Sequence, residues 1–96
     1  MYQKSNQITV DLRQVVTPDA LHGALATALE FPSFYGRNWS AFWDAVTGLV
    51  EMPGTLTFVG WPALVERLPE EAEQLRKCLD ELTEKFPSSA VKVIYD

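Results

Sequence analysis

The chain has 96 residues, 47% of them hydrophobic, with 13 acidic and 8 basic residues and a formal net charge of −5. This length allows one compact domain over residues 1–96 and excludes a second one. The acidic balance repels a phosphate backbone, so direct binding of nucleic acid is not expected and a basic protein is the favoured partner, although solubility alone also accounts for mild acidity.

The apolar runs and the cysteine count restrict the cellular location. No apolar run approaches the roughly 20 residues that cross a bilayer. The first residues, MYQKSNQITV, lack the basic, apolar and small-residue progression of a signal peptide. The single cysteine, Cys78, excludes an internal disulfide and a multi-cysteine metal site. We therefore expect a cytoplasmic protein that does not bind membranes.

The first half of the chain predicts one strand and two helices. Residues 8–12 (ITVDL) alternate apolar and polar side chains, as in a strand. A helix begins with Thr17 as N-cap and Pro18 at its first position, and its apolar stripe consists of Leu21, Ala24, Leu25, Ala28 and Leu29. The next helix is expected from its N-cap, Asn38, to about Val50, with a buried stripe of Phe42, Ala45, Val46 and Leu49.

The second half repeats this order. Residues 55–59 predict a strand, a short helix starts near Pro62, and a longer helix starts at Pro69. The longer helix has acidic residues in its first turn, where the helix dipole favours them, and is expected to bury Ala72, Leu75, Leu79, Leu82 and Phe86. Residues 90–95 (AVKVIY) predict the last strand. The order β, α, α, β, α, α, β predicts a small α/β domain whose strands run parallel and are flanked by about four helices.

Candidate catalytic residues are scarce. His22 is predicted as a partly exposed residue at the flank of a helix stripe, and no nucleophile or base pattern accompanies it. Cys78 has no basic neighbour that would lower its pKa, so it is predicted to be an inert, partly buried thiol. Metal-binding and phosphate-binding motifs are absent from the sequence. We therefore expect neither an enzyme nor a cofactor or metal site.

The segment FPSFYGRNWSAFWDA, residues 31–45, is unusually rich in aromatic residues. Gly36 is expected to adopt positive φ in the turn before Asn38. The core has room for Phe31, Trp39 and Phe42 only, so the remaining aromatic residues should form a patch beside the outward-facing residues of the helix. An aromatic patch around a carboxylate, here that of Asp44, has the composition of an interface hot spot, and a purely structural loop is the alternative.

The same segment, extended to FPSFYGRNWSAFWDAVTGLVEMP, resembles the signature of the barstar family, P-x-[YF]-Y-G-x-N-x-[DS]-A-x-W-D. The resemblance implies a three-stranded parallel sheet with helices packed on it and the function of an intracellular inhibitor of a microbial ribonuclease. It also implies a partner-binding surface formed by Phe34, Tyr35, Gly36, Asn38, Trp39, Ser40, Trp43 and Asp44. An acidic residue of the last helix completes this surface in the family, and the helix phase favours Glu81 over Asp80 and Glu84.

In this interpretation the carboxylate of Asp44 occupies the position of the RNA phosphate in the active site of a basic microbial ribonuclease, as in toxin immunity of a bacterial cell, and a monomer forms a 1:1 complex. Ser40 stands where many members of the family carry aspartate, and Phe34 where tyrosine is common, so the preferred ribonuclease can differ. Arg37 adds a positive charge beside the patch. The alternative is a non-catalytic adaptor or regulatory module that binds a different basic protein.

Overall fold

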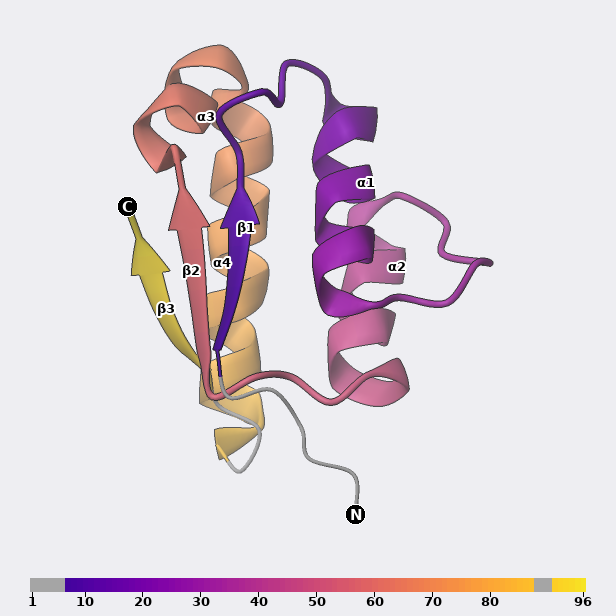
Figure 1. Cartoon of the computed structure of the whole chain (residues 1–96). Helices are drawn as coiled ribbons and strands as arrows, with labels where there is room; N and C mark the ends of the chain where they lie inside the picture. The colour runs from indigo at the N-terminus through magenta and orange to yellow at the C-terminus, as the bar shows by residue number, and fades with distance from the viewer. Residues whose placement is uncertain (1–6, 88–90) are drawn as a thin grey trace.

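The computed structural model describes residues 7–87 and 91–96, and within these residues three parallel strands form one sheet (Figure 1). The strands are β1 (Gln7–Asp11), β2 (Thr55–Val59) and β3 (Lys92–Tyr95), with β2 in the centre. Their register places Val10, Phe58 and Tyr95 side by side. The predicted class, a small α/β domain with a three-stranded parallel sheet flanked by helices, is confirmed, although β1 begins and ends one residue earlier than expected.

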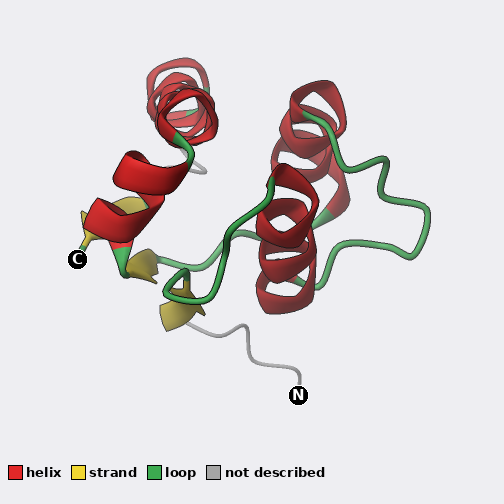
Figure 2. Cartoon of the chain, turned by 90° about the horizontal axis from the view of Figure 1, so that it is seen from above, coloured by secondary structure: helices red, strands yellow, loops and turns green. Residues whose placement is uncertain are grey.

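The helices are α1 (Pro18–Leu29), α2 (Trp39–Asp44), α3 (Trp61–Arg67) and α4 (Pro69–Lys85), and the π-helical turn η1 (Ala45–Leu49) continues α2. Seen from above, they lie on one side of the sheet (Figure 2). That face of the sheet carries the buried residues Val10, Leu56 and Phe58. Residues of the opposite face, such as Thr9 and Lys92, are exposed.

The predicted helix starts are confirmed by their caps. The hydroxyl of Thr17 accepts a hydrogen bond from the main-chain N–H of Ala20 at 3.1 Å. The side-chain oxygen of Asn38 accepts one from the N–H of Ala41 at 2.7 Å. These bonds satisfy N–H groups that have no partner inside the helix, and they fix where α1 and α2 begin.

Two residues expected in the core are exposed instead. Leu49 is 51% exposed because η1 closes with a wider turn, in which the N–H of Val50 donates to the carbonyl of Ala45. Residues of such a turn advance by less than the 100° of an α-helix, so Leu49 lies farther round the helix from Val46 than it would in an α-helical turn. Phe86 is 43% exposed because α4 ends at Lys85 and the helical phase no longer positions the next side chain.

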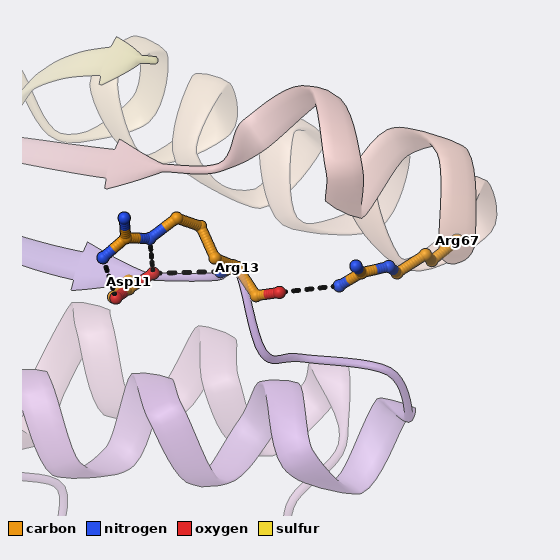
Figure 3. Close-up of polar contacts among 3 residues, drawn as sticks. All are labelled: Asp11, Arg13 and Arg67. Carbon is orange, nitrogen blue, oxygen red and sulfur yellow. Dashed lines mark hydrogen bonds and ion pairs between the residues drawn. The ribbon is translucent and has the colours of Figure 1, made fainter.

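A polar cluster joins α3 to the carboxyl end of β1 (Figure 3). The guanidinium of Arg67 donates to the main-chain carbonyl of Arg13 at 2.8 Å, and the guanidinium of Arg13 pairs with Asp11, also at 2.8 Å. This hydrogen-bonded pairing lowers the pKa of the Asp11 carboxyl to about 2. Gly60, which precedes α3, adopts a φ of 85° and lies so close that an added Cβ would be 2.7 Å from Cγ of Arg13. The chain therefore needs glycine at this crossing.

Candidate protein-binding surface

The loop between α1 and α2 turns at Arg37, not at Gly36. Arg37 adopts a φ of 51°, whereas Gly36 does not adopt a positive φ. The prediction of positive φ at Gly36 is therefore wrong. Gly36 is needed for a different reason, the close approach of the Asn38 side chain, which donates to the Gly36 carbonyl at 3.2 Å. A Cβ at Gly36 would lie 3.3 Å from that amide nitrogen, so a larger residue would disturb the cap of α2.

Arg37 holds this loop against α1. Its guanidinium forms an ion pair with the carboxylate of Asp19 at 2.8 Å and donates to the Asp19 carbonyl at 3.4 Å. Figure 1 shows the loop projecting beside α1, at the end of the molecule away from β3. The positive charge expected beside the aromatic patch is therefore already paired within the chain.

His22 lies beneath the loop. Its ring is 3% exposed, and its Nδ1 is hydrogen-bonded with the Tyr35 hydroxyl at 2.7 Å. The prediction of a partly exposed residue is wrong because the rings of Tyr35 and Trp39 cover it, with centroids 5.8 and 4.5 Å away. Burial lowers the pKa of His22 from its ordinary value of 6.5, although the charges of Glu71 and Asp19 oppose this shift.

Tyr35 and Trp39 are half-buried supports of the surface. Burial raises the pKa of Tyr35 to about 12, so its hydroxyl stays neutral. The indole N–H of Trp39 donates to the carboxylate of Glu71 on α4 at 3.3 Å. The Trp39 ring packs against the ring of Phe42 in the core, with centroids 5.4 Å apart. Both side chains thus have polar partners within the chain.

The exposed residues of the surface include Phe34, Ser40 and Asp44, and Trp43 is half-buried. Phe34 is 74% exposed, the highest value among the large apolar residues described. Within the described part of the chain, the carboxylate of Asp44 has no hydrogen-bond or ion-pair partner, and only its main-chain carbonyl accepts a weak bond from Thr47. An aromatic side chain and an unpaired carboxylate are therefore both available to another molecule.

A shallow hollow of about 400 Å³ lies between α2 and α4. Its lining from α2 consists of Trp39, Ser40, Trp43 and Asp44, and that from α4 of Cys78, Glu81 and Lys85. The structure thus brings Glu81 to the side of Asp44, whereas Asp80 and Glu84 do not line this hollow.

Glu81 and Asp44 therefore face the same hollow, although they belong to different helices and are far apart in the sequence.

Three residues of this surface were not expected from the sequence. Lys85 lines the hollow, and its ammonium lies 3.8 Å from the Glu81 carboxylate. The ring of Phe86 contacts that of Trp43, with centroids 6.2 Å apart. Cys78 is half-buried there, and burial raises its thiol pKa, in agreement with an inert role. The spacing of residues 78, 81 and 85 indicates that these side chains share one face of α4, but it does not indicate which helix that face packs beside.

Other kinds of site find no support in the described residues. Among them, no group of three or more His, Cys, Asp or Glu side chains is placed to hold a metal ion. No helix in the same part of the chain has the length and apolar character needed to cross a membrane. The aromatic and acidic surface across the loop, α2 and α4 is the candidate functional site because of its exposed Phe34 and the hollow that Asp44 and Glu81 line.

Comparison with known proteins gives the family of the chain. The family described as Barstar (barnase inhibitor) matches residues 5–95. The chain belongs to the barstar family. A Bacillus subtilis (strain 168) protein named "Putative ribonuclease inhibitor YrdF" is 37% identical, with the match covering 73% of this chain and 89% of that protein. The barstar family membership confirms the resemblance, supports a ribonuclease-inhibitor role and agrees with the prediction that the chain is not an enzyme.

Proposed function

We propose that this protein inhibits a small, basic bacterial ribonuclease by covering the enzyme's active site with the loop before α2, α2 itself and Glu81 of α4. The observation that carries the proposal is the unpaired carboxylate of Asp44, exposed at the edge of a hollow that Trp39 and Trp43 also line. The protein acts in the cytoplasm as a monomer that binds one enzyme molecule, and protects the cell from the ribonuclease activity.

The chemistry of the partner's active site explains the choice of residues. A ribonuclease holds the scissile phosphate with cationic side chains, and a carboxylate accepts charge-assisted hydrogen bonds from the same groups. Asp44 takes the place of the phosphate, and the neighbouring aromatic rings exclude water from the contact. The net charge of −5 accelerates the encounter with a basic enzyme.

The supporting residues reduce the cost of binding. Tyr35 and Trp39 are already held by His22 and Glu71, and Arg37 is held by Asp19. A surface whose side chains are fixed before binding loses less conformational entropy when the complex forms. Phe34, which projects from this fixed loop, supplies apolar contact area to the partner.

The test is a titration of a panel of small basic ribonucleases with the wild-type protein, Asp44→Asn and Asp80→Asn. Asp80 is exposed on α4 and does not line the hollow, so its variant removes the same charge elsewhere. Truncating one partner of a buried charge pair costs about 2–5 kcal/mol, a range that includes measurements on a complex of this family. We therefore expect Asp44→Asn to weaken inhibition at least about 30-fold and Asp80→Asn to leave it nearly unchanged.

Each outcome has a definite meaning. Stoichiometric inhibition of at least one enzyme by the wild type, lost in Asp44→Asn only, supports the inhibitor function and the phosphate-mimic role together. Equal weakening of inhibition by both variants would still support the inhibitor function but reject the specific role of Asp44, because total charge would then explain the effect. No response from any enzyme would reject the inhibitor function and favour an adaptor that binds a different basic protein.

A further inference from the structure

The hollow between α2 and α4 contains a cation of its own. Lys85 lines it together with Ser40, Asp44 and Glu81. The Lys85 side chain is 61% exposed, and its ammonium lies 3.8 Å from the Glu81 carboxylate. A molecule that binds across the hollow therefore meets two carboxylates and one ammonium rather than a uniformly acidic surface.

This ammonium has two effects on a binding partner. It already interacts with Glu81, so a partner arginine or lysine that approaches Glu81 competes with Lys85 and is repelled by it. It also offers a donor to a carboxylate or a neutral acceptor of the partner. Ser40, which also lines the hollow, is uncharged and so offsets neither effect.

The other cation near the surface does not take part in this balance. The Arg37 guanidinium is paired with Asp19 on the α1 side of the loop, at 2.8 Å, and it does not line the hollow between α2 and α4. Lys85 is thus the basic side chain that a partner meets in this hollow, within the part of the chain that the structure describes.

We propose that Lys85 is a specificity-determining residue, which selects ribonucleases that present a carboxylate or an uncharged group to the end of α4 and disfavours those that present a cation there. This inference rests on the proposed function, because it concerns which ribonuclease fits the inhibitor surface. Lys85 lies at one edge of the interface, so the effect of its charge on affinity depends on the group that each enzyme places there.

The experiment measures the dissociation constants of the ribonuclease panel for the wild type, Lys85→Gln and Lys92→Gln at low and at moderate salt. Lys92 is exposed on β3, on the open face of the sheet, so its variant makes the same change in net charge away from α2. Lys92→Gln should change the dissociation constants of all enzymes by one common factor. Lys85→Gln should shift them unequally, with a spread of about fivefold between enzymes that shrinks as salt rises.

Two further variants separate a charge effect from a structural one. Lys85→Arg keeps the charge and should retain the wild-type ranking of enzymes. In the Glu81→Gln background, Lys85→Gln should have a smaller effect on enzymes that place a cation near Glu81, because the competition for that carboxylate is already removed. Thermal unfolding of each variant establishes that the comparison is made between folded proteins.

The failure of this inference is distinguishable from the failure of the proposed function. If the wild type inhibits enzymes of the panel but Lys85→Gln and Lys92→Gln shift all of them alike, Lys85 contributes only to net charge and the specificity role is overturned. If Lys85→Arg changes the ranking as much as Lys85→Gln, the role of its charge is overturned. If the wild type binds no ribonuclease, the proposed function itself fails, and the inference fails with it.

Discussion

The hydrogen bond between His22 and Tyr35 permits a sharp test, because the chain contains a second tyrosine whose hydroxyl is in the opposite situation. The Tyr35 hydroxyl is hydrogen-bonded with the buried His22 ring at 2.7 Å. The Tyr95 hydroxyl is buried and has no hydrogen-bond partner among the described residues. Both rings pack against other aromatic side chains. Replacing each tyrosine by phenylalanine removes one oxygen atom and leaves the ring contacts in place.

The expected magnitudes differ in size and direction. Tyr35→Phe leaves Nδ1 of His22, a side chain only 3% exposed, without its partner, and an unsatisfied buried polar group costs about 1–3 kcal/mol. For a domain of this size, each kcal/mol lowers the melting temperature by about 4–8 °C. Tyr95→Phe removes a hydroxyl that gains nothing in the folded state, so the free energy of unfolding should stay the same or increase.

Equilibrium unfolding in urea measures both differences, and a constant m-value shows that the same transition is being compared. If Tyr35→Phe is as stable as the wild type, the His22 contact does not hold the loop and the reasoning is refuted. If Tyr95→Phe loses as much stability as Tyr35→Phe, the hydroxyl of Tyr95 has a partner in solution, and the contrast between the two sites is wrong.

Two other predictions concern titration and backbone. The chain has one histidine, so an NMR titration follows His22 alone and should give a pKa below 6.5. With this lowered pKa, the unfolded chain binds the proton more tightly than the folded chain does. The contribution of His22 to the free energy of unfolding should therefore be full above pH 6.5 and fall as the pH drops from 6.5 to the lowered pKa. Stability that rises over this interval as the pH drops would contradict the buried, neutral state of the ring. Gly60→Ala should cost more than about 1 kcal/mol in thermal unfolding, since its Cβ would be 2.7 Å from Cγ of Arg13 at a φ of 85°, whereas Gly48→Ala, with nothing within 4 Å, should be nearly neutral. Equal losses in the two variants would show that the crossing at Gly60 is not tight.

Local sequence signals determined most of the fold. Thr17 and Asn38 cap helices because their side chains reach N–H groups three residues away, an interaction that depends on neighbouring residues only. The strands follow from alternation and β-branched residues, and parallel pairing follows from the helices between them. The aromatic patch of the loop and α2 could be predicted for the same reason, since its residues form one continuous segment, and the resemblance to the barstar family then indicated the individual binding residues.

Only the tertiary structure decided which side chains are covered and which elements meet. His22 became buried because Tyr35 and Trp39 fold over it, and Leu49 became exposed because the last turn before β2 is π-helical. The pairing of α2 with α4 placed Glu81 and Lys85 beside Asp44. Helix periodicity gives the face of each helix but not its neighbour, because the choice of neighbour depends on how all the apolar faces pack together over the sheet.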